Sequence, residues 1–143
     1  MKLAAVRCGF CGELNEIDVG AAAERPECAH CSKPVLLDRP LKVAQDDFDA
    51  TVLRAPVPVM VDFYADWCAP CKMVAPLMDE FAHQQIGKML VVKVNTDLAP
   101  EIAMKYDIRS IPTVVLIVDG EETERSLGFE PERLRDFVTR AVG

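Results

Sequence analysis

The sequence contains three Cys-x-x-Cys pairs, CGFC at 8–11, CAHC at 28–31 and CAPC at 68–71, which together account for all six cysteines. Two thiolates at this spacing can bind a metal ion from one tight turn. The same two thiols can instead form a disulfide and so carry a pair of electrons. The spacing alone does not separate these two chemistries, so the sequence around each pair must do so.

The first two pairs form the pattern C-x2-C-x16-C-x2-C, and this interval lies within the range of four-cysteine zinc sites. We predict one zinc ion held by Cys8, Cys11, Cys28 and Cys31. Gly12 follows the first pair directly and suits a turn that needs a positive φ. The alternatives are two disulfides or four free thiols, and a reducing compartment disfavours the disulfides.

The third pair follows a predicted buried strand, 57–65, and begins a predicted helix, 68–85. The unpaired N–H groups at a helix N-terminus stabilise a thiolate, so we expect the pKa of Cys68 to fall. Cys68 is expected in an exposed first turn, and Cys71, one turn further in, is expected to be shielded. This asymmetry suits thiol–disulfide exchange, in which an outer thiolate attacks and an inner thiol resolves the mixed disulfide.

The elements that position these pairs differ between the two ends of the chain. Residues up to about 34 show little apolar periodicity and could not form a core alone, whereas from about residue 41 helical and strand patterns alternate. We place the boundary between 1–36 and 37–143, with Pro34 and Pro40 as breaks. The expected elements are a short helix capped by Asp46 or Asp47, strands at 57–65, 89–97, 113–120 and 121–129, and helices at 68–85, 99–106 and from 131 onward. They predict an α/β fold with a central sheet and helices on both faces.

The composition excludes several classes of function. The 143 residues carry a net charge of −7, which disfavours a nucleic-acid binder and a protein that docks on anionic lipid. No apolar run approaches the roughly 20 residues that cross a bilayer. Because Arg7 interrupts the short apolar stretch LAAV, we expect no signal peptide and a cytoplasmic protein. Cysteines in that compartment are typical metal ligands or redox catalysts.

Two segments resemble the thioredoxin family: VDFYADWCAPCKMVAP at 61–76 and KYDIRSIPTVVLIVDG at 105–120. The resemblance extends from about residue 41 to the end, and the added four-cysteine segment resembles the zinc-containing bacterial branch called thioredoxin-2. It implies a thioredoxin fold, a central mixed sheet flanked by helices, with a small N-terminal zinc ribbon. It also implies a monomeric thiol-disulfide oxidoreductase that reduces disulfides in cytosolic client proteins. A flavin-dependent thioredoxin reductase that draws on NADPH would recharge it.

The resemblance also implies roles for individual residues. Cys68 would be the attacking nucleophile and Cys71 the resolving thiol. Trp67 would lie beside the pair and shape the docking surface, and Pro70 would constrain the turn between the sulfurs. Pro112 would be cis and lie against the disulfide, offering backbone groups to an extended substrate strand.

Asp62 lies in the middle of the apolar run VPVMVDFYA. A carboxylate there is unfavourable unless it is paired or protonated. From the residues alone, two interpretations are equally good: Asp62 faces outward, or it is buried with a raised pKa and accepts the proton of Cys71. The resemblance favours the second interpretation, with Lys93 on the neighbouring strand as its partner.

Two other functions remain open at this point. The same fold can act as an oxidant or isomerase, and Ala69 stands where Gly is commonest in the family, which leaves the reduction potential undetermined. Alternatively, the ribbon could be a binding or chaperone module that carries the redox unit as a sensor. A measured reduction potential distinguishes a reductase from an oxidant or isomerase. Zinc content and disulfide reduction, measured on Cys68→Ser and on a protein without residues 1–34, test the binding-module function.

Overall fold

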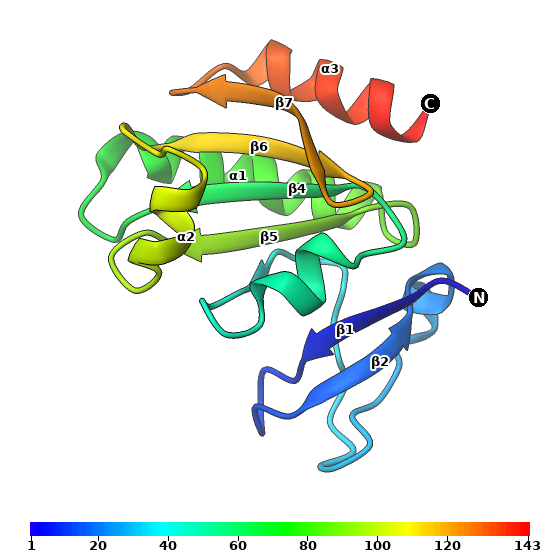
Figure 1. Cartoon of the computed structure of the whole chain (residues 1–143). Coiled ribbons are helices and arrows are strands. Elements are labelled where there is room, and N and C mark those ends of the chain that lie inside the picture. Colours follow the sequence, from blue (N-terminus) through cyan, green and yellow to red (C-terminus); the bar gives the residue numbers. More distant parts are fainter.

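The computed structural model describes all residues, 1–143, and Figure 1 shows their arrangement. The elements are β1 (Leu3–Arg7), β2 (Leu14–Asp18), the 3₁₀ helix η1 (Val19–Glu24), β3 (Leu41–Lys42), the π-helix η2 (Asp49–Leu53), β4 (Val59–Tyr64), α1 (Ala69–Gln84), β5 (Leu90–Asn95), α2 (Pro100–Lys105), β6 (Thr113–Val118), β7 (Glu121–Leu127) and α3 (Pro131–Val142). The predicted alternation of strands and helices from residue 57 onward is confirmed. None of these helices combines the length and apolar character that crossing a bilayer requires.

The central sheet has five strands in the order β3-β5-β4-β6-β7. β3, β5 and β4 run parallel, whereas β6 and β7 pair antiparallel, so the sheet is mixed as predicted. Asp119 and Gly120 form the turn between β6 and β7, and both have a positive φ (53° and 80°), as the Asp-Gly pair predicts. The acidic β7 lies at the edge of the sheet, where charges discourage pairing with another chain.

Side chains of β4 alternate between two apolar layers. Met60 packs in the layer with residues of α1 and α3, such as Met78 and Phe137. Val61 and Phe63 point to the opposite face, where η2, α2 and the N-terminal segment lie. Asp62 belongs by this alternation to the α1 face. The two layers therefore bury β4 on both sides, as its unbroken apolar run predicts.

We call residues 1–36 the ribbon and residues 37–143 the body. In the ribbon, β1 and β2 form an antiparallel two-stranded sheet that the sequence pattern did not reveal, because each strand has only five residues. Val6, Ile17 and Val19 nevertheless belong to the same buried apolar cluster as Phe48 and Val52 of the body. The ribbon was expected to lack a core of its own, and it shares the core of the body.

The ribbon lies on the β5 side of the central sheet (Figure 1), and polar side-chain contacts also join it to the body. The buried Asp47 accepts hydrogen bonds from Arg7 Nε at 2.9 Å and from the amide of Ala44 at 2.7 Å. Thr51 Oγ1 donates to the carbonyl of Ala5 at 2.6 Å. The prediction that Asp46 or Asp47 caps a helix is wrong, because η2 has Phe48 as its N-cap without a side-chain bond and Asp47 binds Arg7 instead.

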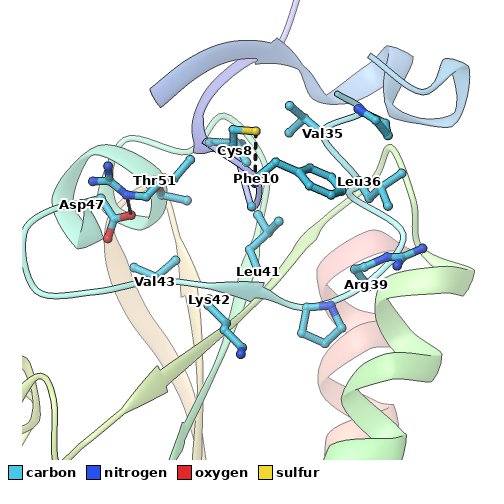
Figure 2. A pocket seen from close by; sticks show the side chains of 15 residues that line it. Cys8, Phe10, Val35, Leu36, Arg39, Leu41, Lys42, Val43, Asp47 and Thr51 are labelled. Atoms are coloured by element: carbon cyan, nitrogen blue, oxygen red, sulfur yellow. Dashed lines mark hydrogen bonds and ion pairs between the residues drawn. The ribbon is translucent and has the colours of Figure 1, made fainter. Parts of the chain in front are cut away.

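A groove of about 560 Å³ lies at this junction, between the first cysteine turn and the short strand β3. Figure 2 shows the side chains that line it. Phe10 and Leu41 contribute apolar side chains to it, and the Arg7–Asp47 pair lies at one end. Its basic groups are largely paired, since Arg7 binds Asp47 and Arg39 binds Asp38. The groove is lined by residues of both the ribbon and the body, so it lies at their interface.

Candidate active site and four-cysteine site

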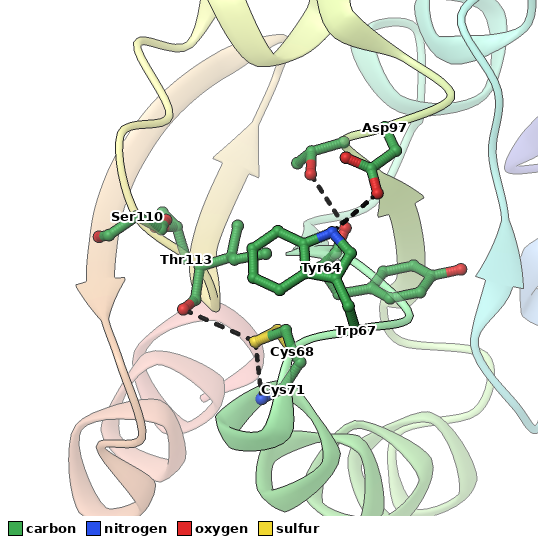
Figure 3. The surroundings of a disulfide bond; sticks show 9 residues. Tyr64, Trp67, Cys68, Cys71, Asp97, Ser110 and Thr113 are labelled. Atoms are coloured by element: carbon green, nitrogen blue, oxygen red, sulfur yellow. Dashed lines mark hydrogen bonds between the residues drawn. A yellow bond between two sulfur atoms is a disulfide. The ribbon is translucent and has the colours of Figure 1, made fainter.

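Cys68 and Cys71 form a disulfide at the N-terminal end of α1, with their Cα atoms 5.3 Å apart (Figure 3). Cys68 is the N-cap of this helix, and its sulfur accepts a hydrogen bond from the amide of Cys71 at 3.2 Å. Pro70 lies in the first turn, where the missing N–H of proline leaves no helical bond unmade. The helix N-terminus therefore offers a free N–H group, that of Cys71, to the sulfur of Cys68, as predicted.

The expected difference in exposure between the two cysteines is wrong. Cys68 is 3% exposed and Cys71 is 4% exposed. Each sulfur is bonded to the other, and the carbonyl oxygen of Ile111 lies 3.8 Å from Cys68 Sγ. The asymmetry of the pair therefore lies in their surroundings, because only Cys68 contacts both the helix N-terminus and the Ile111 loop.

Trp67 is 72% exposed directly before the disulfide. Its indole Nε1 donates to Asp97 Oδ2 at 2.9 Å, which Figure 3 shows as a link across the top of the site. An exposed aromatic ring held in one orientation is suited to contact a partner protein. Nothing in the sequence singled out Asp97, since a carboxylate after a strand is a common loop residue.

The Ile111–Pro112 peptide bond is cis, as the resemblance implied. Pro112 has no N–H, and its carbonyl oxygen already accepts a hydrogen bond from Gly128 at 2.9 Å. The backbone groups beside the sulfurs therefore belong to Ile111 and not to Pro112 itself.

Asp62 is 1% exposed, and neither of its carboxylate oxygens has a hydrogen-bond partner. Burial raises the pKa of Asp62 to about 7, and the positive charge of Lys93 opposes this rise. Lys93 is the register partner of Asp62 on β5, but its Nζ lies 4.6 Å from the ring centroid of Tyr64 and makes no ion pair with the carboxylate. Lys93 therefore acts on Asp62 through its charge, and the expected direct pairing is not formed.

Asp62 and Cys71 both line a cavity of about 140 Å³. Its lining includes Asp62, Lys93 and Cys71, together with Lys72 and Ala75 of α1. This volume has room for water molecules, which require polar partners of the kind that Asp62 and Lys93 provide. The carboxyl group of Asp62 and Cys71 therefore share one cavity.

The other four cysteines come together in the ribbon, and their sulfurs all lie within 4.8 Å of one another. The Sγ atoms of Cys8 and Cys31 are 3.7 Å apart, and those of Cys11 and Cys28 are 3.6 Å apart. Four sulfurs about 2.3 Å from one central ion would be separated by roughly 3.8 Å along each edge of the tetrahedron. The four-cysteine site therefore fits a tetrahedral metal ion such as zinc.

The two cysteine turns, Cys8–Gly12 and Cys28–Ser32, repeat one hydrogen-bond pattern. Gly12 N donates to Cys8 O, and Ser32 N donates to Cys28 O, each at 3.0 Å. Gly12 and Ser32 both have a positive φ (82° and 64°), which confirms the turn predicted at Gly12. We call these two turns the first and second knuckle.

Backbone N–H groups inside each knuckle point at sulfur. Phe10 N lies 3.4 Å from Cys8 Sγ, and His30 N lies 3.4 Å from Cys28 Sγ. Hydrogen bonds from the Cys31 amide, the Asn15 side chain and the His30 amide lower the pKa of the Cys28 thiol to about 6. These donors favour the thiolate form that binds metal.

Comparison with known proteins gives consistent results for the body. The Thioredoxin family model matches residues 39–140, so the whole of the ribbon lies outside it. The chain is 42% identical over 123 residues, 85% of this chain and 70% of the relative, to a chloroplastic M-type thioredoxin of Triticum aestivum. It is 48% identical to thioredoxin 1 of Nostoc sp., over 64% of this chain and 85% of the relative. Among solved structures, a mutant thioredoxin from Halobacterium salinarum matches with a TM-score of 0.68 at 35% identity, over 75% of this chain and 94% of that one. These matches confirm the predicted fold class.

Proposed function

Because this chain belongs to the thioredoxin family, and is therefore a thiol-disulfide oxidoreductase, we propose that it is a protein-disulfide reductase of the zinc-containing thioredoxin-2 type. The observation that carries the proposal is the Cys68–Cys71 disulfide at the N-terminus of α1, where the Cys71 amide donates to Cys68 Sγ. The same amide can stabilise a thiolate on Cys68 once the pair is reduced.

In the first step, the Cys68 thiolate attacks one sulfur of a client disulfide. A new bond forms between Cys68 and that sulfur, and the client's second sulfur leaves as a thiolate. Trp67 and the backbone groups of Ile111 border the reacting sulfur and would orient the client chain. Pro112 holds the Ile111 loop in this position, and its carbonyl is fixed by Gly128.

In the second step, Cys71 loses its proton and attacks Cys68 Sγ. The Cys68–Cys71 disulfide forms, the mixed disulfide breaks, and the client leaves as a second thiolate. We assign the proton to Asp62, whose pKa of about 7 lets it accept a proton at neutral pH, through the cavity that it shares with Cys71. Lys93 would keep the pKa of Asp62 from rising further.

The oxidised pair must then receive two electrons before another turnover. We propose a thioredoxin reductase as their source, in keeping with the family. Pro70 and Ala69 lie between the two sulfurs in the exposed turn and would influence how readily this disulfide is reduced.

The ribbon is proposed to hold one zinc ion on Cys8, Cys11, Cys28 and Cys31, as the sulfur separations favour. Such an ion, when bound, would fix the two knuckles and add folding energy without taking part in electron transfer. We propose the boundary between zinc ribbon and redox unit at residues 36 and 37. We also place the protein in the cytoplasm, where reducing conditions keep such thiolates available.

The decisive experiment is an insulin reduction assay on the full chain with NADPH and a thioredoxin reductase, together with a zinc assay on the same sample. We expect catalytic reduction and one zinc per chain. Cys68→Ser should abolish reduction and retain zinc, whereas Cys28→Ser should lose zinc and retain the Cys68–Cys71 disulfide. A Cys68→Ser protein that still reduces insulin would exclude the proposed mechanism. The full chain is used because the ribbon shares its core with the body.

A further inference from the structure

Asn15 lies between the two knuckles at a buried position of β2, where it is 7% exposed. Its side-chain nitrogen donates to Cys28 Sγ at 3.4 Å and to the carbonyl of Glu13 at 3.1 Å. Its side-chain oxygen accepts from the amide of Ala29 at 2.9 Å. One side chain thus contacts the segment after the first knuckle, the backbone of the second knuckle and a ligand sulfur.

The partners of Asn15 fix the orientation of its amide. A backbone carbonyl such as that of Glu13 can only accept, and the backbone amide of Ala29 can only donate. The NH₂ group must therefore face Glu13 and Cys28, and the oxygen must face Ala29. The hydrogen bond to the sulfur follows from this geometry.

We propose that Asn15 is a positioning residue of the metal site, which holds the second knuckle against the first and donates a hydrogen bond to the sulfur of Cys28. This inference rests on the proposed function of the ribbon as a metal site. Groups that donate a hydrogen bond to a metal ligand orient that ligand, and their loss typically weakens metal binding 10- to 100-fold.

The position of Asn15 supports a role specific to the metal site. β2 alternates exposed and buried residues, and Ile17, the next buried residue, packs into the shared apolar cluster. A polar side chain at such a position would be unfavourable without partners. Two of the three side-chain hydrogen bonds of Asn15 go to the second knuckle, at Cys28 and Ala29, and the third goes to Glu13, the residue that directly follows the first knuckle. No hydrogen bond joins Asn15 to the body, so its substitution should act on the ribbon.

The test compares the wild-type protein with Asn15→Asp and Asn15→Ala, each as the full chain. Asn15→Asp has nearly the same shape and keeps the acceptor for Ala29, but loses both donors. Asn15→Ala loses the donors without adding a charge. Ala23→Asp, at an exposed ribbon position, is the matched control for the added charge. Zinc affinity is measured by competition with a chromophoric chelator, and Co²⁺ is used as a spectroscopic probe.

We expect both Asn15 variants to bind zinc about 10- to 100-fold more weakly, and the control to bind as the wild type does. In the Co²⁺ proteins the tetrahedral ligand-field bands should persist, while the sulfur-to-cobalt charge-transfer band shifts in both Asn15 variants and not in the control. A role in packing alone would leave that band in place. Reduction of insulin by Cys68 and Cys71 should be unchanged in all three variants, which shows that the body is folded.

Unchanged zinc affinity in both Asn15 variants would overturn the proposal, as would an unshifted charge-transfer band. Loss of affinity in Asn15→Asp but not in Asn15→Ala would also overturn it, because the added charge would then be the cause. A wild-type protein that binds neither zinc nor Co²⁺ would instead refute the metal site itself.

Discussion

Asp62 and Lys93 occupy the same register position on the parallel strands β4 and β5, yet the carboxylate of Asp62 has no hydrogen-bond partner. Lys93 lies instead against the ring of Tyr64, with its Nζ 4.6 Å from the ring centroid. Desolvation therefore outweighs the nearby positive charge, and the pKa of Asp62 rises to about 7. A buried acid with this pKa changes its protonation state close to neutral pH, which is what exchange of a proton with Cys71 requires.

Asp62→Asn should slow the resolution of the mixed disulfide by about tenfold or more, because the amide cannot accept the proton of Cys71. Formation of the mixed disulfide by Cys68 should be less affected. Single-turnover measurements with a disulfide substrate over pH 6–9 separate the two steps. Wild-type rates of the second step throughout this range would exclude Asp62 as the acceptor.

Asp62→Asn should also change how stability depends on pH. Below pH 3.8, the ordinary pKa of an aspartate, the carboxyl is protonated in both the folded and the unfolded wild type, so variant and wild type should respond alike. As the pH rises from 3.8 to about 7, the unfolded state releases this proton and the folded state keeps it, so the wild type loses stability. Above pH 7 this loss in the wild type's free energy of unfolding should level off at roughly 4 kcal/mol, measured against the free energy of unfolding of Asp62→Asn. Urea unfolding at several pH values checks this, and parallel curves for the two proteins would contradict it.

Lys93→Met should raise the pKa of Asp62, because the positive charge of Lys93 is what holds that pKa down. The pH at which the second step becomes fast should then move upward. The pKa can be measured by NMR of the Asp62 carboxyl group in the oxidised protein. Lys88→Met, at an exposed position before β5, serves as a control and should leave the pKa of Asp62 unchanged.

Cys71→Ser should trap the mixed disulfide between Cys68 and a client. The serine hydroxyl cannot displace the client from Cys68 Sγ, so the first step occurs and the second does not. Non-reducing gel electrophoresis and mass spectrometry would detect the adduct, and a reductant should release it. Cys68→Ser should form no such adduct, and an adduct on Cys71 in that variant would reverse the assigned roles.

Arg7→Ala should lower the free energy of unfolding by about 2 kcal/mol, because Asp47 is buried and loses the side chain that pairs with it. Arg39→Ala removes an exposed ion pair with Asp38 and should change stability by about 1 kcal/mol or less. Chemical denaturation of both variants provides the comparison. Equal effects of the two substitutions would mean that the Arg7–Asp47 contact contributes no more than a surface pair.

The sequence predicts the body well because its signals are local and strong. The apolar run before Cys68, the Asp119-Gly120 turn and Pro131 at the start of α3 each predict an element that the structure contains. The position of Cys68 at a helix N-terminus follows from the same signals. The environment of Asp62, in contrast, depends on which face of β4 it occupies, and an unbroken apolar run has no alternation that would reveal the face.

The metal ligands of the ribbon were predicted from the sequence, but its two strands, β1 and β2, were not. Cysteine spacing reveals the ligands directly, whereas β1 and β2 are too short for their alternation to stand out. Asn15 could have been recognised only as a polar residue at a core position of an unrecognised strand. Asp47 was misassigned for a different reason, since its partner Arg7 lies 40 residues away and no local pattern indicates such a pair.

The common interior of residues 1–36 and 37–143 bears on protein engineering. A chimaera that moved only the first 36 residues onto another thioredoxin would separate Val6, Ile17 and Val19 from the apolar side chains of the body that bury them. The smallest transferable piece must therefore also carry η2 and the turn before it, which supply Asp47, Phe48 and Val52. Zinc binding by such a chimaera would depend on this segment of the body as much as on the four cysteines.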